Sequence, residues 1–400
     1  MKHPLFLSLY LPSFLFFFSS GVLGPITPLY MNSFDINLSY VGLMLSMASL
    51  GKMTVEIPGG ILIARLGIKR SLLIGMFMIS LATIAMFWSS SPLEVLIYQF
   101  ITGVGSMFYQ TAHLSYAASV TEHDNRGRSL SMLGGMNRLS RIIAPALGGV
   151  LATSISLKFP FLFSGFIYLI AMIIVLINVP NVYAQPRQTT SNLRILWRVA
   201  RQNADPLWRV GIGAVLLTTV RMARFTLLPL FASEVLGLDA SQIGIILSVA
   251  SIADMLNVYT AGTLMDRFGR RWAAIPCVAV MAFSMVLMPF TSGFWGLLLV
   301  GVIAGAGNGF GSGIMMTMGS DLAPRENREE FLSLWILLLD LGGVACPMIV
   351  GGISDILSLT ASGFAFFGIG VFGVIAFLFL VPETQRQRAT HAAPQTTSEA

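Results

Sequence analysis

Eight charged residues of this sequence fall inside apolar segments, where a charge is costly and usually marks a binding site or a buried ion pair. Three of them are acids and five are bases, so two positive charges remain even if every acid pairs. The set is Lys52, Glu56, Arg138, Arg141, Arg221, Arg224, Asp254 and Asp340. These residue types favour charge recognition or proton transfer. No metal-ligand cluster or nucleophile–base pair stands out, so we do not expect an enzyme.

The spare arginines indicate an anionic ligand. Arg221 and Arg224 are three residues apart, which places them on one face of a helix. A guanidinium group matches carboxylate, phosphate or sulfonate, whereas a site for cations would more often carry unpaired acids. Arg141 is a third spare arginine. The alternative is that Arg221 and Arg224 bond helix-end carbonyls or polar neighbours.

The acids are candidate proton carriers, because burial favours the neutral form of a carboxyl group that lacks a cation. Glu56 lies one helical turn after Lys52 and can share its charge, and Asp254 and Asp340 complete this group. His113 is the only histidine inside an apolar segment, and we count it with the spare arginines among the candidate residues of a binding cavity. Its side chain either titrates near neutral pH or serves packing.

The composition places these charges in a membrane. Of 400 residues, 55% are hydrophobic and only 10% are charged, against about 25% charged in soluble domains. The chain is therefore predicted to be a polytopic membrane protein. Cys277 and Cys346 both lie in apolar runs, and we expect small hydrophobic side chains there instead of a disulfide or a metal site.

Roughly twelve apolar segments are long enough to cross a bilayer as helices, which takes about 20 residues each. The expected spans are 5–30, 39–64, 71–89, 93–120, 129–152, 160–180, 209–232, 241–265, 272–290, 294–320, 330–353 and 360–381. The first twenty residues resemble a secretory signal, but the apolar run continues to Tyr30 and further spans follow. We therefore expect the first segment to be retained as a span.

The cations alternate with the spans. With the N-terminus in the cytoplasm, most Lys and Arg residues fall on the inner side, which predicts that both termini lie inside. Residues 181–208 form a more polar linker, in which NLRILWRVARQ predicts a short amphipathic helix on the inner leaflet. The alternative is a solvated linker. The polar tail, residues 389–400, is expected to be disordered.

The chain repeats itself at a shift of 202 residues. GILIARLGIKR at 60–70 meets GTLMDRFGRR at 262–271, and ITGVGSMF at 101–108 meets IAGAGNGF at 303–310. The register holds without a gap over roughly a hundred residues. We therefore predict an all-α protein of two homologous six-helix bundles in parallel orientation, residues 1–180 and 209–388. Parallel repeats of this kind recur in secondary transporters.

The turn between the second and third helices resembles the signature G-x-x-x-D-R-x-G-R-R/K of the major facilitator superfamily. The second half carries it in full, as Gly262, Asp266, Arg267, Gly269, Arg270 and Arg271. The first half carries Gly60, Arg65, Gly67, Lys69 and Arg70. In the first copy, Ala64 occupies the position of the signature aspartate. The resemblance implies a latch in which this aspartate contacts a cation or the N-terminus of another helix, so the latch can form in full only at the second copy. We expect Asp266→Asn to impair transport and Ala64→Asp to be tolerated.

The fifth helix is similar to the family's drug antiporters, whose motif is G-x-x-x-G-P-x-x-G-G. In RIIAPALGG at 141–149, Pro145, Gly148 and Gly149 fit, while Arg141 and Ala144 replace glycines. The antiporters' arginine on the fourth helix is replaced here by Gln99. The chain therefore resembles the twelve-helix drug:proton antiporter branch with departures at these markers.

The resemblance implies that the second helix faces the eleventh and the fifth faces the eighth across the boundary between the halves. It therefore predicts a pair between Lys52 and Asp340, which the repeat maps onto Asp254 and Arg138. The alternative is pairing within one half. The resemblance also places the seventh helix, with Arg221 and Arg224, on the central cavity.

These observations predict a secondary transporter of a bacterial inner membrane that works by alternating access. Proton-coupled efflux of amphipathic compounds is what the resemblance implies. Organic-anion transport is the alternative that the arginines favour, and a lipid translocator is a further one. We expect a small-molecule substrate, protons and the bilayer as partners, a monomer, and neither a cofactor nor a nucleic acid; no Walker-type loop indicates an ATP-driven pump.

Overall fold

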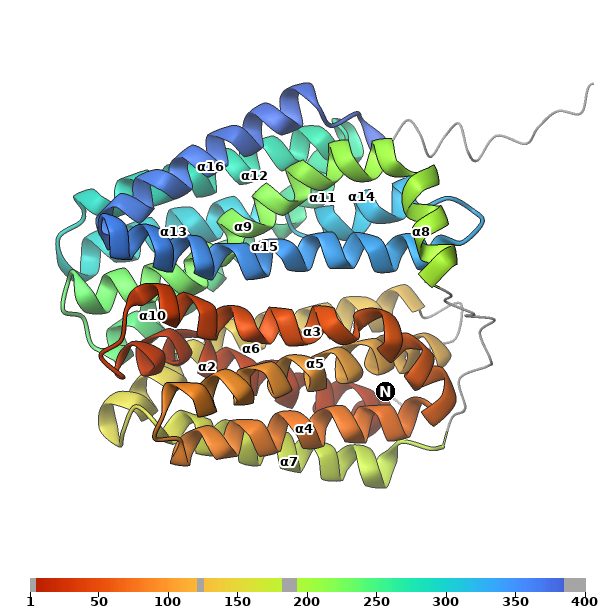
Figure 1. The fold of residues 1–400 in the computed structure, drawn as a ribbon, viewed down its shortest axis with the longest axis horizontal. Coiled ribbons are helices and arrows are strands. Elements are labelled where there is room, and N and C mark those ends of the chain that lie inside the picture. Colours follow the sequence, from red (N-terminus) through yellow and green to blue (C-terminus); the bar gives the residue numbers. More distant parts are fainter. Residues whose placement is uncertain (1–4, 121–125, 182–192, 385–400) are drawn as a thin grey trace, which may run out of the picture.

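The computed structural model describes residues 5–120, 126–181 and 193–384, and all regular secondary structure in those ranges is helical (Figure 1). The first half contains η1 (Phe6–Tyr10), α2 (Leu11–Asn32), α3 (Leu38–Leu66), α4 (Ile68–Trp88), α5 (Pro92–Val120), α6 (Arg126–Ser154) and α7 (Phe159–Asn178). The second contains α8 (Leu193–Gln202), α9 (Ala204–Glu234), α10 (Ala240–Leu256), α11 (Val258–Arg267), α12 (Arg270–Leu287), η3 (Met288–Phe290), α13 (Gly293–Phe310), α14 (Ile314–Leu322), α15 (Arg328–Ile356) and α16 (Leu359–Phe379). The predicted tail, 389–400, lies outside the described residues.

The helices are long enough to cross a bilayer. Ten segments in the described part of the chain, of 20 to 31 residues each, meet both the length and the hydropathy that a span requires. Helices α5 and α6 are equally long, at 29 residues each, but carry more polar residues, including His113, Asn137, Arg138 and Arg141. With these two, the predicted arrangement of twelve long helices in an all-α membrane protein is confirmed.

Two predicted spans are interrupted. The expected helix 241–265 breaks at Asn257, between α10 and α11. The expected helix 294–320 breaks between Phe310 and Ile314, where Gly313 adopts a left-handed conformation with φ of 77°. Glycine populates this region without steric cost, so the run GFGSG permits a break that the apolar pattern alone did not predict. Both breaks prove to lie beside the charged residues described below.

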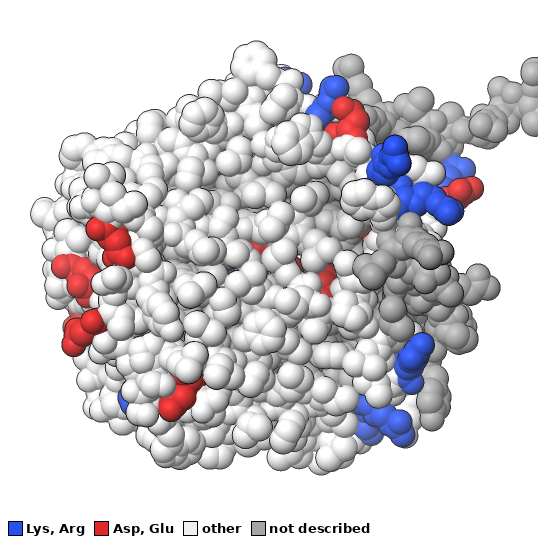
Figure 2. All heavy atoms as spheres, viewed as in Figure 1, with Lys and Arg blue, Asp and Glu red and all other residues white. Residues whose placement is uncertain are grey.

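The helices form two bundles, α2–α7 and α9–α16, which lie against each other along their lengths (Figure 1). Here the end of the molecule that carries α8 is called the linker end, and the opposite end is called the pocket end. Figure 2 shows most of the Lys and Arg at the linker end, with some Asp and Glu among them, and further Asp and Glu at the pocket end; the broad band between the two ends carries few charges. This band is the surface that a lipid bilayer would surround.

The bundles meet chiefly through α3 against α15 and α6 against α10. A Cβ atom built at Gly42 would lie 2.2 Å from the carbonyl oxygen of Pro347, and one at Gly244 would lie 2.3 Å from that of Pro145. The repeat shift relates these two contacts, since it takes Gly42 to Gly244 and Pro145 to Pro347. Glycine therefore permits backbone contact between the bundles at two symmetry-related places.

The amphipathic helix predicted in the linker is α8, which packs on α15 and α9. Its Leu196 and Val199 are buried, whereas Trp197 is 73% exposed beside the exposed Arg198 and Arg201. The apolar face predicted for the membrane surface is thus divided. Leu196 turns toward the protein, because α15 offers an apolar partner, and Trp197 remains outside. The linker residues 182–192 lie outside the described part of the chain.

Candidate functional site

Three charged side chains lie at the boundary between α3 and α15. Lys52 Nζ is 3.0 Å from Asp340 Oδ1, and the two side chains are 23% and 17% exposed. Glu56, one turn along α3, interacts electrostatically with both of them. Within the described residues, Glu56 Oε2 and Asp340 Oδ2 have no hydrogen-bond partner. Two acids therefore share one cation across the two bundles.

The symmetry-related pair that the repeat predicted, Arg138 with Asp254, does not form. Arg138 Nη2 instead donates to Ser312 Oγ at 2.9 Å, across the boundary between the bundles. Asp254 Oδ2 accepts from Asn308 Nδ2 at 2.7 Å and is 3.8 Å from Arg224 Nη2. The break between α13 and α14 exposes Ser312 to Arg138, and Asp254 has closer partners within its own bundle. The pair that the resemblance predicted, Lys52 with Asp340, is therefore present, and the pair that the repeat derived from it is not.

Arg224 is almost completely buried, with its side chain 1% exposed. Its guanidinium carbon is 4.7 Å from the centre of the Phe225 ring, which is within the range of a cation–π interaction. Neither Nη1 nor Nη2 has a hydrogen-bond acceptor among the described residues. The Asp254 carboxylate is the charged group within 4 Å, yet it is too distant for a hydrogen bond.

Arg221 and Arg141 lie close to this group. Arg221 Nη2 donates to the carbonyl oxygen of Gly311 at 3.2 Å, which is the helix-end bond that the sequence left open as an alternative. Arg141 Nε donates to Asn137 Oδ1 at 3.2 Å, and its side chain is solvent-accessible. Arg141 interacts electrostatically with Asp254 and with the other arginines of the cluster. The arginine cluster is defined here as Arg138, Arg141, Arg221 and Arg224.

His113 lies inside the first bundle. Its Nε2 forms a short hydrogen bond with Ser13 Oγ, and its ring stacks on Tyr109 with centroids 5.4 Å apart. Because Ser13 Oγ also donates to the carbonyl oxygen of Leu9, the shared hydrogen belongs to Nε2 and the ring is the donor. The contacts of His113 join α5 to α2, which fits the packing alternative.

The second copy of the loop signature is an ion-paired network at the linker end. Arg270 Nε is 3.1 Å from Asp321 Oδ2, and both side chains are nearly buried. Arg270 Nη1 donates to the carbonyl oxygen of Met265 at 2.7 Å, and Asp266 Oδ1 is 3.4 Å away. Asp266 is 80% exposed, so the buried acid that holds Arg270 is Asp321.

Glu383 caps the N-terminus of α12. Its two carboxylate oxygens accept from the backbone N–H groups of Arg270 and Arg271, at 2.8 and 3.3 Å. Arg271 Nη2 donates to the carbonyl oxygen of Leu378 at 2.7 Å, which ties α12 to α16. A carboxylate at a helix N-terminus is stabilised by the helix dipole, so Glu383 stabilises the start of α12.

The first copy lacks this network. Arg65, Lys69 and Arg70 form no ion pair within the described residues, although Gly67 retains the positive φ of its counterpart Gly269. The repeat shift places Ser119 opposite Asp321 and Asn181 opposite Glu383. Asp321 and Glu383 were not predicted from the sequence. They could have been found by aligning the two halves, because each is an acid that only the second half carries. The remaining signature residues, Gly60, Gly262 and Arg267, lie on α3 and α11.

The helix-five motif packs one helix against two partners. A Cβ atom at Gly148 would lie 2.1 Å from the carbonyl oxygen of Val22 on α2, and one at Gly149 would lie 2.2 Å from that of Ala240 on α10. Pro145 contributes the carbonyl that faces Gly244. The motif therefore lies at the interface of α6 with its neighbours.

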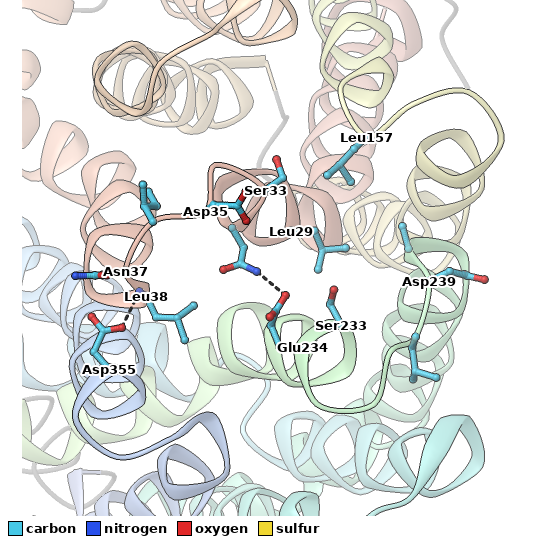
Figure 3. A pocket seen from close by; sticks show the side chains of 14 residues that line it. Leu29, Ser33, Asp35, Asn37, Leu38, Leu157, Ser233, Glu234, Asp239 and Asp355 are labelled. Carbon is cyan, nitrogen blue, oxygen red and sulfur yellow. Dashed lines mark hydrogen bonds between the residues drawn. The ribbon is translucent and has the colours of Figure 1, made fainter.

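A pocket of about 570 Å³ opens at the pocket end, between the two bundles (Figure 3). Asn32 Nδ2 donates to Glu234 Oε1 at 2.6 Å, and the Asp355 carboxylate accepts from the backbone N–H groups of Leu38 and Ser39, both at 2.8 Å. Asp355 thus caps the N-terminus of α3 from the opposite bundle. On the other edge, the Ser241 N–H donates to Thr153 Oγ1 at 3.1 Å. The same contacts that line the pocket join the bundles.

Comparison with known proteins agrees with this architecture. The family model of the Major Facilitator Superfamily matches residues 9–258 and 210–398, so the chain belongs to this superfamily. It is a multi-pass membrane protein that transports small molecules and is not an enzyme. The two cysteines are free and buried, as expected.

Individual relatives are distant but nearly full-length. The quinolone resistance protein NorA of Staphylococcus aureus is 23% identical over 382 residues, covering 92% of this chain and 95% of NorA. Multidrug resistance protein 1 of Bacillus subtilis is 24% identical over 352 residues, covering 86% and 88%. An MFS-type transporter of Methanocaldococcus jannaschii is 22% identical over 366 residues, covering 90% and 93%.

Solved structures share the fold. A peptide transporter POT in complex with sulfate superposes with a TM-score of 0.80 at 14% identity, covering 97% of this chain and 96% of that one. The nucleoside transporter NupG superposes with a TM-score of 0.74 at 15% identity, covering 95% and 99%. At this identity the likeness establishes the fold alone.

Proposed function

We propose that this protein exports small amphipathic compounds in exchange for protons, by alternating movement of its two bundles, residues 1–180 and 209–388. The observation that carries the proposal is the Lys52–Asp340 ion pair with Glu56 beside it, at the boundary that must open and close. The drug-resistance names of the S. aureus and B. subtilis relatives support export of amphipathic substrates.

The net charge of this group gives a reason for it to bind a proton. Lys52, Glu56 and Asp340 together carry one net negative charge when both acids are ionised. A single proton on either acid makes the group neutral, which favours its burial in a medium of low dielectric constant. Separation of Lys52 from Asp340 removes that acid's only ion-pair partner in the described part of the chain, so protonation of Asp340 accompanies opening of the boundary.

The distribution of charge supports an orientation. Lys and Arg gather at the linker end in Figure 2, and juxtamembrane cations are retained in the cytoplasm. The linker end and both termini are thus assigned to the cytoplasm of a bacterial inner membrane, with the pocket end outside. Exposed Trp197 and Trp208 near the linker end fit the membrane–water interface on that side.

A transport assay tests this function. The protein is reconstituted into vesicles, a pH gradient is imposed, and uptake of a lipophilic cation and of octanoate is followed. Proton-driven accumulation is expected for at least one compound, with loss in Asp340→Asn. Movement of every compound at the same rate without a gradient would remove proton coupling from the proposal.

Organic-anion transport is the second candidate, and the arginine cluster favours it. Arg141 and Arg224 share one acid, Asp254, and the two Nη atoms of Arg224 have no acceptor among the described residues. In the same vesicles, an anion transporter accumulates octanoate in preference to the cation and loses this preference when Arg221 and Arg224 are replaced by Gln. Preference for the cation in the unchanged protein, with no effect of these replacements, would exclude this candidate.

A further inference from the structure

We propose that a singly charged anionic group of the substrate binds between Arg141 of α6 and Arg224 of α9, and that Asp254 is the internal counterion with which it competes. The shared chemistry is that of a carboxylate, a sulfonate or a phosphate diester on an apolar body. This inference rests on the second candidate above, organic-anion transport, and assigns its binding site and its selectivity to named residues.

The local charge requires an anion. The arginine cluster contributes four positive charges, and Asp254 is the acid with which both Arg141 and Arg224 interact. The two acids of the other charged group, Glu56 on α3 and Asp340 on α15, interact with Lys52. They therefore do not balance the charge of the arginine cluster. An excess of positive charge in a low-dielectric region is costly, and a bound anion lowers that cost.

The donors of Arg224 are arranged for a ligand that is not Asp254. Both Nη atoms are buried and lack hydrogen-bond acceptors in the described part of the chain. Asp254 Oδ2 remains at 3.8 Å, because Asn308 Nδ2 holds the same oxygen at 2.7 Å. A charge-assisted hydrogen bond to guanidinium would need about 2.7–2.9 Å. Asp254 therefore balances the charge of Arg224 without occupying its hydrogen bonds.

Arg141 supplies the contact from the opposite bundle. Its one hydrogen bond to a described residue uses Nε, with Asn137 Oδ1 as acceptor, so Nη1 and Nη2 remain for a ligand. The side chain is solvent-accessible, whereas that of Arg224 is 1% exposed. An anion that bridges the two would meet Arg141 first and then Arg224. Because the donors belong to different bundles, the bound anion would also join the bundles.

The role of Asp254 follows from competition. An incoming carboxylate that takes up the Arg224 donors removes the need for Asp254 as counterion, while Asn308 still holds the Asp254 oxygen. Compounds without an anionic group gain nothing from the exchange. Asp254 thus lowers the affinity for every anion and prevents the empty cluster from carrying its full charge.

The test is direct binding to the full-length protein in lipid nanodiscs, measured by calorimetric titration with octanoate and with octylammonium as the matched cation. The unchanged protein is expected to bind octanoate more tightly than octylammonium. Asp254→Asn should bind octanoate about threefold or more tightly, and Arg141→Gln and Arg224→Gln about tenfold more weakly. Arg209→Gln is the control, because Arg209 is exposed and pairs with Asp205 on its own helix; it should leave affinity unchanged.

Two results would overturn the proposal: weaker octanoate binding in Asp254→Asn, or unchanged binding in Arg141→Gln. Arg141→Gln decides the question if the buried variants do not fold, since Arg141 is solvent-accessible and loses a single hydrogen bond. The proposed transport is tested separately. If octanoate binds with the expected pattern among the variants but is not taken up into vesicles, the binding site is supported and anion transport is rejected. Proton-driven cation export with octanoate binding insensitive to Arg141→Gln would remove the site and leave the first candidate, proton-coupled export, in place.

Discussion

Asn32 Nδ2 donates to Glu234 Oε1 at 2.6 Å, and the two residues are 202 positions apart, the shift that relates the two halves of the chain. A bond between equivalent residues must lie on the pseudo-twofold axis. The same shift relates the contact of Ser39 with Asp355 to that of Ser241 with Thr153. Among the described residues, the bundles are therefore joined at the pocket end by one axial bond and by two symmetry-related contacts to helix N-termini, of which one acceptor is a carboxylate and the other a neutral hydroxyl.

The Asp355 carboxylate should hold the bundles together at the pocket end more strongly than the Thr153 hydroxyl does on the other edge. Asp355→Ala removes the acceptor for two N–H groups of α3, which costs about 1 kcal/mol in closure of the pocket end. A two-state equilibrium then shifts about fivefold toward the open form. Spin labels at Asn37 and Leu357 should report the shift as a larger population of long distances.

Two variants calibrate that measurement. Asp355→Asn should shift the distances less, because asparagine is also a good cap. Thr153→Val removes the neutral acceptor on the other edge and should have a smaller effect than Asp355→Ala. Identical distance distributions for Asp355→Ala and the unchanged protein would show that this cap does not hold the pocket end.

Adjacent glycines on α15 predict opposite outcomes. A Cβ atom at Gly351 would lie 2.3 Å from the carbonyl oxygen of Leu38 on α3, whereas one at Gly352 would meet nothing within 4 Å. Gly351→Ala should push the bundles apart and reduce transport severely. Gly352→Ala should keep transport and gain up to about 1 kcal/mol of stability from helix propensity. Vesicle uptake compares the two, and equal activities would refute backbone contact at Gly351.

The ion pair of Lys52 with Asp340 predicts partial rescue by exchange. Either single exchange changes the net charge of the group formed by Lys52, Glu56 and Asp340 by two, which costs up to about 3–5 kcal/mol if the site remains dry, whereas the double exchange restores that net charge. Lys52→Asp combined with Asp340→Lys should therefore retain more transport than either single change. Uptake by the three variants is compared at equal protein in the vesicles. A double variant no better than the singles would mean that the pair does not act in transport.

The linker-end network predicts that Asp321 matters more for stability than Asp266. Asp321→Asn leaves the nearly buried Arg270 without its main partner and should cost about 3–5 kcal/mol. The Asp266 side chain is 80% exposed, so Asp266→Asn should change stability by less than about 1 kcal/mol. Thermal unfolding is followed with a thiol-reactive dye, which reaches the buried Cys277 and Cys346 only on unfolding.

Transport separates the two acids further. Asp266→Asn is predicted to impair transport and Ala64→Asp to be tolerated, since the first copy of the signature lacks the whole network. Asp321→Asn should impair transport at least as much as Asp266→Asn. An unfolding temperature lowered equally by both substitutions would contradict the assignment of the buried pair to Asp321.

The one cross-bundle ion pair that could be predicted shows what the resemblance provides and what the repeat adds. The resemblance implied that the second helix faces the eleventh, so Lys52 and Asp340 were expected to meet, and they lie 3.0 Å apart; the repeat added only the equivalent pair, Arg138 with Asp254. The repeat could not predict where symmetry fails. Asn308 and Arg224 compete for Asp254, and the GFGSG break offers Ser312 to Arg138. These contacts depend on atomic distances that a sequence pattern does not contain.

The sequence by itself determined that this is a membrane transporter with twelve helices in two equivalent halves, and which charged residues need a partner. Hydropathy and internal repeats can be read from the order of residues alone. Only the tertiary structure decided which partner each charge takes. It placed the buried Asp321 beside Arg270, identified Glu383 as the cap of α12, and left the two Nη atoms of Arg224 without an acceptor among the described residues. Those outcomes rest on helix breaks and backbone contacts of a few ångströms, where competing acceptors differ too little in sequence to be ranked.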